Sequence, residues 1–163
     1  YCRLSAAPVG RYLIDLHGGL KDGDKKNYEG SDALCHALQI LNHLQDCRED
    51  FLILNRVYLP LDIMKKHNVE LHHLTANTAS LELRACLDDI LDKVDKLINE
   101  ATRFPSKLNS WRLAMESQVI ISIAIKLSEK LRKSDPIATK IKLSSFAYIK
   151  CFILGSCKAF IKC

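Results

Sequence analysis

The sequence contains little proline and little glycine: four prolines and six glycines among 163 residues. This composition is unlike that of fibrous, collagen-like or low-complexity chains. The sequence also lacks any long stretch of alternating apolar and polar residues, which is the pattern of a half-buried strand. We therefore expect an ordered protein without an extended sheet.

Cysteine is present, but without the spacing of a metal or disulfide site. The seven cysteines are an odd number, lie far apart and include no C-x-x-C pair. This pattern argues against a disulfide framework and against a zinc site. We interpret most of the cysteines as small apolar core residues, and expect a cytoplasmic, reducing location.

A charged leader followed by an apolar segment is also lacking, so we expect no signal peptide. The chain begins at Tyr1 rather than at methionine, which suggests a fragment. Lysines interrupt the apolar positions of 137–162, so this stretch does not form the run of about 20 apolar residues that spans a bilayer.

The net charge is +5 and the isoelectric point is about 8.8, with much of the positive excess after residue 126. A basic surface of this kind fits nucleic acid, an anionic membrane surface or ordinary solvent exposure. No arginine-rich recognition helix or aromatic stacking platform is present, so we expect no nucleic-acid partner. A solvated surface and peripheral membrane contact both remain open, and the oligomeric state is not indicated.

What the sequence does contain is helical periodicity over most of its length, with 48% hydrophobic residues to bury. We expect a helix over residues 1–17 with a kink at Pro8, a loop over 18–30, and a helix from a cap at Ser31 or Asp32 to about Asp50. Further helices are expected over 61–68, 79–103, 111–133 and 137–162. The expected fold is a single all-α domain, 1–163, in which about five helices surround a cavity.

The stretch 31–60 carries the most informative pattern. Asn42, Asp46 and Asp50 are four residues apart and share one helix face, about 6 Å from one to the next along the axis. Two carboxylates and a carboxamide at this spacing could hold Mg²⁺ against a diphosphate, because Mg²⁺ prefers oxygen ligands and keeps substrate phosphates. The alternative is an ordinary solvated face.

Two other polar groups are poor candidates for a metal site. The histidines at 67, 72 and 73 have irregular spacing, so we interpret them as surface residues. The aspartates at 88, 89, 92 and 95 alternate with Lys93 and Lys96, which predicts a salt-bridged outer helix face. Arg112 and Glu116 are likewise expected to form an ion pair along their helix.

At this point several segments become recognisable together: NHLQDCRED, the following RVYLP, the opening YCRLSAAPVGR, and WRLAME with SDPIA near the C-terminus. The chain resembles the squalene/phytoene synthase family, and within it the hopanoid-pathway squalene (hydroxysqualene) synthase branch. The resemblance implies a helical bundle of the isoprenoid (prenyl) synthase type. It also implies that the bundle is incomplete at the N-terminus, because the family's first aspartate-rich motif would precede Tyr1.

The resemblance assigns roles to individual residues. It implies that Asn42, Asp46 and Asp50 hold Mg²⁺ as the second aspartate-rich motif, and that Tyr1 faces the reacting carbocation. It further implies a prenyl channel lined by Ser5, Ala6, Val9 and Gly10, and diphosphate contacts from Gln39 and Arg56. From the residues alone, Arg56 could equally be a surface arginine. Gln45 is neutral where the family often has a basic residue, which puts some phosphate affinity in doubt.

The implied activity is Mg²⁺-dependent ionisation of farnesyl or presqualene diphosphate, followed by coupling or rearrangement toward squalene or hydroxysqualene. Because one metal-binding wall is missing, we expect this chain to be inactive alone. The alternative is a truncated or degenerate family member that acts as a non-catalytic assembly or binding protein. A helical domain outside the family is a third alternative, and an Asp-x-x-x-Asp row upstream would favour the enzyme.

Overall fold

The computed structural model describes residues 1–21 and 28–162, with side chains as far as residue 157. Its helices are α1 (Cys2–Ser5), α2 (Ala7–Leu16), α3 (Glu29–Leu54), α4 (Leu61–Lys66), α5 (Leu81–Ala101), α6 (Trp111–Lys133) and α7 (Ser145–Lys162). Two short 3₁₀ helices, η1 (Leu71–Leu74) and η2 (Pro105–Lys107), lie between them. Over the described residues, the only extended pairing is an isolated bridge between Leu20 and Leu108. The all-α prediction is confirmed, but residues 22–27 of the expected loop lie outside the described ones.

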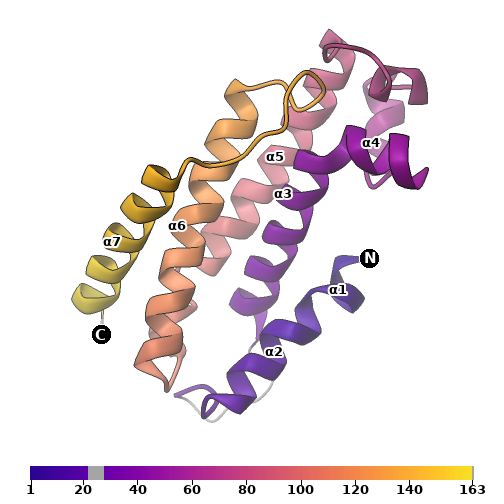
Figure 1. The fold of residues 1–163 in the computed structure, drawn as a ribbon. Helices are drawn as coiled ribbons and strands as arrows, with labels where there is room; N and C mark the ends of the chain where they lie inside the picture. The colour runs from indigo at the N-terminus through magenta and orange to yellow at the C-terminus, as the bar shows by residue number, and fades with distance from the viewer. Residues whose placement is uncertain (22–27, 163) are drawn as a thin grey trace.

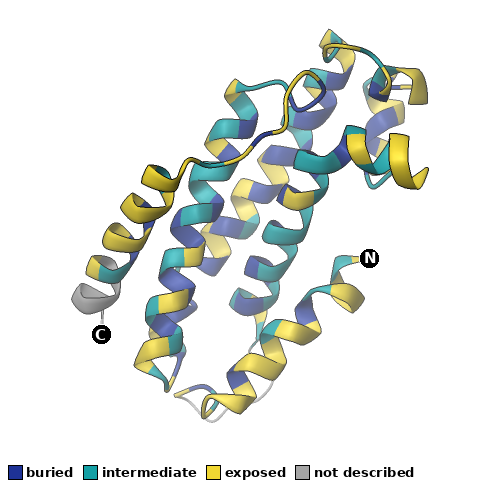
Figure 2. Cartoon of the chain, viewed as in Figure 1, coloured by how far each residue is buried: buried dark blue, intermediate teal, exposed yellow. Residues whose placement is uncertain are grey.

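The long helices form a bundle (Figure 1). Helix α3 packs against α5, α5 against α6, and α6 against α7, while α1 and α2 lie along one side of α3. Figure 2 shows long exposed faces on α2 and α7, the helices at the two edges of the bundle. Among the described residues, no helix is long and apolar enough to cross a membrane.

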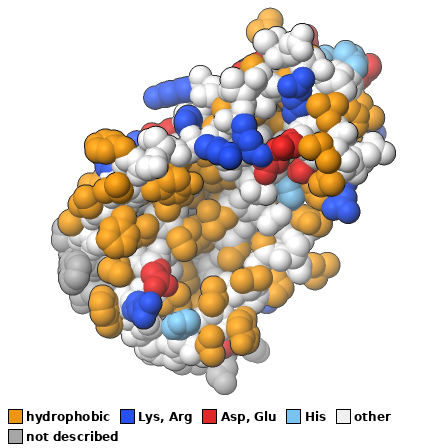
Figure 3. All heavy atoms as spheres, viewed as in Figure 1, with side chains coloured by type: hydrophobic (Ala, Val, Ile, Leu, Met, Phe, Trp, Pro, Cys, Tyr) orange, Lys and Arg blue, Asp and Glu red, His pale blue; other side chains and the backbone are white. Residues whose placement is uncertain are grey.

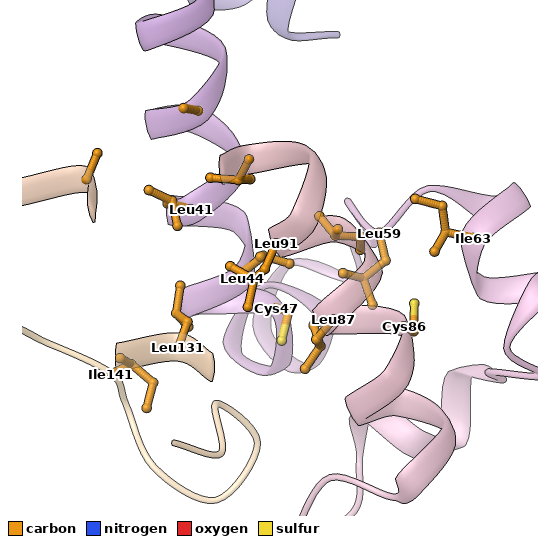
Figure 4. Close-up of a cluster of buried hydrophobic side chains, with 14 of the residues drawn as sticks. Leu41, Leu44, Cys47, Leu59, Ile63, Cys86, Leu87, Leu91, Leu131 and Ile141 are labelled. Carbon is orange, nitrogen blue, oxygen red and sulfur yellow. The ribbon is translucent and has the colours of Figure 1, made fainter. Parts of the chain in front are cut away.

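The core lies where α3, α5 and α6 meet. Leu41 and Leu44 of α3 are almost fully buried, as are Leu87 and Leu91 of α5 and Leu131 of α6. Figure 4 shows these side chains converging with residues from the segments after α3 and α6. Burying this apolar surface drives the helices together at roughly 25 cal/mol per Å², and it leaves the opposite face of α3 for polar side chains.

The N-terminal helix is divided in two at Ala6, so the expected kink at Pro8 is in fact a break. Pro8 lies in the first turn of α2, where a missing backbone N–H costs nothing because no carbonyl precedes it within the helix. Gly10 then sits directly on α3: a Cβ at Gly10 would lie 2.6 Å from Ser31 Oγ and 2.7 Å from Cys35 Sγ. Its lack of a side chain permits this close helix contact.

Both predicted ends of α3 are wrong. The helix begins at Glu29 after Tyr28, and neither Ser31 nor Asp32 caps it. Ser31 is buried beside Gly10, and Asp32 accepts a 2.9 Å hydrogen bond from Arg11 Nε. Both side chains therefore serve contacts with α2. At the other end, α3 runs on past Asp50 to Leu54, and Asn55 stops it in the left-handed conformation at φ 51°.

The last helix also begins later than predicted, at Ser145 rather than near residue 137. Residues 134–144, here called the strap, instead run without helix across α3. Arg48 Nη1 donates to the Ile137 carbonyl at 3.3 Å, and Gln45 Nε2 donates to the Ile141 carbonyl. These long side chains tie the strap to α3, so helix could not form there without losing the contacts. By contrast, α4, the span of α6 and the Ser110 cap of α6 are confirmed.

Candidate functional site

Asn42, Asp46 and Asp50 lie on the side of α3 that faces away from the α5 contact. Asn42 is exposed, and the Asp46 and Asp50 side chains are 27% and 19% exposed. Figure 3 shows acidic and basic side chains gathered at one edge of a broad, hollowed apolar face. Because all three side chains are at least partly exposed, a polar group of a ligand could reach the row.

A lysine from the strap stands beside the first carboxylate. Lys140 Nζ lies 3.6 Å from Asp46 Oδ1 and also binds Glu49. The hydrogen bond to Glu49 raises the pKa of Lys140 and lowers the pKa of Glu49. Gln45 cannot supply a charge here, and its amide is engaged with the Ile141 carbonyl. The cation beside Asp46 therefore comes from Lys140, 94 positions along from Asp46.

His43 is the nearest base to the second carboxylate. Its Nδ1 lies 3.9 Å from Asp50 Oδ2, beyond hydrogen-bond length. Burial lowers the pKa of His43, and this effect outweighs the opposing influence of Asp50 and Asp46. This shift favours the neutral form of the imidazole.

Three aromatic rings gather next to the row. The His43 ring stacks on Tyr58 with centroids 3.8 Å apart and planes inclined by 14°. Tyr1 lies 5.6 Å from each of these rings at tilted angles. Arg56 Nη1 donates to Tyr58 Oη at 3.4 Å. The structure thus brings Tyr1 and Arg56, both predicted from the sequence, to the polar row of α3.

Gln39 reaches the same cluster from one turn earlier on α3. Its Nε2 lies 2.9 Å from His43 Nε2. One of its amide hydrogens is thereby committed to His43, and the other remains for a ligand. Its predicted diphosphate contact stays a prediction.

The predicted channel residues of α1 and α2 differ in how far they are exposed. Ser5 and Val9 are exposed, Ala6 is half-buried, and Gly10 is occupied by its contact with α3. Gly10 thus packs directly against α3. The channel role of all four stays a prediction.

The donor set of the row fits a hard divalent cation, because it presents only carboxylate and amide oxygens on its open side. The nearby nitrogens of Lys140 and His43 lie too far from the carboxylates to hydrogen-bond with them. Considering only His, Cys, Asp and Glu in the part of the chain that the structure describes, no group of three could hold a metal. The row itself offers oxygens from one helix, so a metal bound there would take its remaining ligands from other oxygens.

The other polar groups pair with one another, and His67, expected at the surface, is in fact half-buried against Asp89. Asp89 accepts from Lys66 Nζ at 2.7 Å and lies 3.1 Å from His67 Nε2, while Arg132 binds Asp92 at 2.8 Å. The salt-bridged outer face is confirmed, although its cations come mainly from other segments rather than from Lys93 and Lys96. Arg112 and Glu116 form the expected pair at 3.2 Å.

Comparison with known proteins bears directly on this arrangement. The model of the family described as squalene/phytoene synthase matches residues 1–146. The chain belongs to the squalene/phytoene synthase family. It is 40% identical over 144 residues to the hydroxysqualene synthase of Sinorhizobium fredii, covering 88% of this chain and 48% of that protein. The chain therefore spans about half the length of the curated relatives it matches.

Two solved structures have the same fold. The squalene synthase HpnC from Alicyclobacillus acidocaldarius superposes with a TM-score of 0.72 at 32% identity, over 82% of this chain and 49% of that one. A structure of TcSQS with the ligand E5700 gives a TM-score of 0.82 over 99% of this chain and 52% of that one, at 19% identity. The second likeness concerns the fold alone. The predicted isoprenoid synthase type of bundle is confirmed.

No role was assigned from the sequence to two residues of the cluster, His43 and Tyr58. His43 follows Asn42 directly, and it is four residues after Gln39 and seven before Asp50, so it lies on the same side of α3. That spacing could have identified it. Tyr58 is within the RVYLP segment, but only the turn at Asn55 brings it back beside His43.

Proposed function

We propose that this chain provides the second aspartate-rich, Mg²⁺-binding wall of a squalene or hydroxysqualene synthase that acts on farnesyl or presqualene diphosphate. The observation that carries the proposal is the placement of Asn42, Asp46 and Asp50 on the open face of α3. Membership of the family and the likeness to hydroxysqualene synthases support it.

In this proposal the row on α3 holds Mg²⁺ through its oxygens, and each remaining residue has a distinct task. Bound Mg²⁺ would withdraw charge from the departing diphosphate, which favours ionisation of the allylic C–O bond. Arg56 donates to the diphosphate through its planar guanidinium. The face of Tyr1 stabilises positive charge on the prenyl group.

Shielding from water must come from elsewhere. Tyr1 is 72% exposed and Val9 is 59% exposed, so the described residues do not enclose a carbocation. We therefore expect this chain alone to bind a Mg²⁺–diphosphate but to give little or no product. Peripheral membrane contact through the lysine-bearing α7 stays a prediction.

The test compares wild-type protein with Asp46→Asn, using Asp92→Asn on the outer face of α5 as the control. Binding of an unreactive farnesyl diphosphate analogue is measured by calorimetry with and without Mg²⁺. Turnover is followed with radiolabelled farnesyl and presqualene diphosphates. We expect Mg²⁺-dependent binding that Asp46→Asn loses and Asp92→Asn keeps.

Equal binding by Asp46→Asn and wild type would remove the metal role from the row. Mg²⁺-dependent binding without any product, even from protein extended to the length of the relatives, would favour the non-catalytic alternative. Squalene or hydroxysqualene among the products would identify the reaction.

A further inference from the structure

His43 and Tyr58 join four residues that the sequence predicted for the site. Through them, Gln39, Tyr1 and Arg56 form one connected cluster with Asp50. We propose that His43 is a positioning residue, which directs an Nδ1–H toward Asp50 and supports the ring of Tyr1. This inference rests on the metal role proposed for the row of α3.

The contact with Gln39 determines which ring nitrogen of His43 carries the proton. Gln39 Nε2 is an amide donor, and it lies 2.9 Å from His43 Nε2. A nitrogen that accepts this hydrogen bond has no proton of its own, so the imidazole carries its single N–H hydrogen on Nδ1. That nitrogen is the one nearer to Asp50.

The Nδ1–H is therefore a buried donor close to a carboxylate. Among the described residues, Nδ1 is buried without a hydrogen-bond partner, and Asp50 Oδ2 lies 3.9 Å from it. In the proposed site, the Asp50 carboxyl group moves closer by about 0.7 Å, which brings that oxygen within hydrogen-bond range. With one Asp50 oxygen on a metal and the other accepting from His43, the carboxylate is held in a single orientation, as outer-shell donors do at metal sites.

The orientation of the ring is itself restrained. The His43 side chain is 12% exposed and stacks on Tyr58, which also receives the hydrogen bond from Arg56. Turning Nδ1 away from Asp50 would require a flip of the ring, which loses the Gln39 contact. The same stack presents a platform to Tyr1, so one side chain aligns both a metal ligand and the predicted carbocation-facing ring.

The first test needs no metal. Nitrogen NMR of the imidazole distinguishes the two neutral tautomers, and we expect the Nδ1–H form of His43 in the wild type. Gln39→Leu removes the donor and should give a mixture of tautomers. An Nε2–H tautomer in the wild type would overturn the proposal, because the ring would then offer Asp50 no proton.

The second test measures Mn²⁺ binding in the presence of inorganic pyrophosphate by electron paramagnetic resonance. His43→Phe keeps an aromatic ring but removes both nitrogens, and we expect it to lose roughly 10- to 100-fold in Mn²⁺ affinity. His43→Asn places an N–H donor near the original Nδ1 and should recover part of the loss. The control is His36→Phe, two turns earlier on α3, which should bind as the wild type does.

Thermal melting of each variant checks that it is folded. Wild-type Mn²⁺ affinity in a folded His43→Phe variant would overturn the positioning role alone, leaving the proposed function intact. If the wild type itself fails to bind Mn²⁺ with pyrophosphate, the metal role of the row fails and the positioning role fails with it. The two failures are thereby distinguished.

Discussion

Lys140 Nζ lies 3.6 Å from Asp46 Oδ1, although the lysine belongs to the strap and the aspartate to the middle of α3. A positive charge at this distance opposes the binding of a cation to Asp46. We expect Lys140→Met to tighten the binding of free Mn²⁺ by roughly two- to fivefold, a modest change because the pair is partly exposed.

The dependence on salt provides a check on this expectation. The gain from Lys140→Met should shrink in 0.5 M KCl, since the Debye length then falls to roughly 4 Å. Lys133→Met, at the exposed end of α6, is the control and should leave Mn²⁺ affinity unchanged. A Lys140→Met variant that binds Mn²⁺ less tightly would show that Lys140 orders Asp46 rather than competing with metal.

Gly155 provides a test of the α6–α7 contact. A Cβ at this position would lie 2.6 Å from the Cα of Val119 and 2.8 Å from its backbone nitrogen. Backbone atoms cannot move aside cheaply, so we expect Gly155→Ala to lower the free energy of unfolding by about 1–3 kcal/mol. Urea unfolding followed by circular dichroism measures the change.

The neighbouring Ser156 gives a matched control. Its Oγ is buried without a hydrogen-bond partner among the described residues, so Ser156→Ala should be neutral or slightly stabilising. A stabilised Gly155→Ala variant would instead indicate that α7 shifts on α6 and that helix propensity prevails.

The cysteines should differ sharply in reactivity. Burial raises the pKa of Cys47 to about 12 and that of Cys86 to about 11, whereas Cys157 is exposed. Because the thiolate is the reactive form, iodoacetamide at pH 8 should modify Cys157 well before Cys47 or Cys86. Peptide mass spectrometry after timed labelling gives the order, and labelling in 8 M urea should remove the difference. Early modification of Cys47 in the native protein would contradict its burial.

Asp89 should contribute to stability against acid. Hydrogen bonds from Lys66 and His67 hold the pKa of Asp89 well below its ordinary value. A carboxyl group with a lowered pKa stabilises the folded state above its unfolded pKa of about 3.9, and this stabilisation is lost as the pH falls through the folded value. Asp89→Asn should therefore flatten the fall in the free energy of unfolding below about pH 4.

Urea unfolding at a series of pH values between 6 and 2 measures that slope. Glu100→Gln, exposed on the same helix, is the control and should keep the wild-type profile. An unchanged profile in Asp89→Asn would show that other groups dominate acid unfolding.

Much of the fold follows from periodicity and caps in the sequence. The apolar spacing in α5 and α6 predicts both helices, because Ser80 and Ser110 cap them locally. The helix ends that were predicted wrongly depend on distant contacts instead. Asp32 is a good cap in isolation, but Arg11 binds it, and the strap stays non-helical because side chains of α3 hold its carbonyls.

In the site too, local sequence predicts some features, while others depend on distant contacts. Helical spacing predicts that Asn42, Asp46 and Asp50 share a face, and the family resemblance places Tyr1 near them. The approach of Lys140 could not be predicted, since it depends on how the strap crosses α3. The stack of His43 on Tyr58 likewise depends on a chain reversal, which local pattern does not specify.

The chain reversal at Asn55 limits how far the segment after α3 can change in length. Asn55 adopts a left-handed conformation, and only two residues separate it from Tyr58. Inserting even a single residue here would swing the tyrosine ring out of register with the imidazole it covers. The loop after α3 thus acts as a spacer of set length, and loop shortening or grafting should be far less tolerated there than its exposed position suggests.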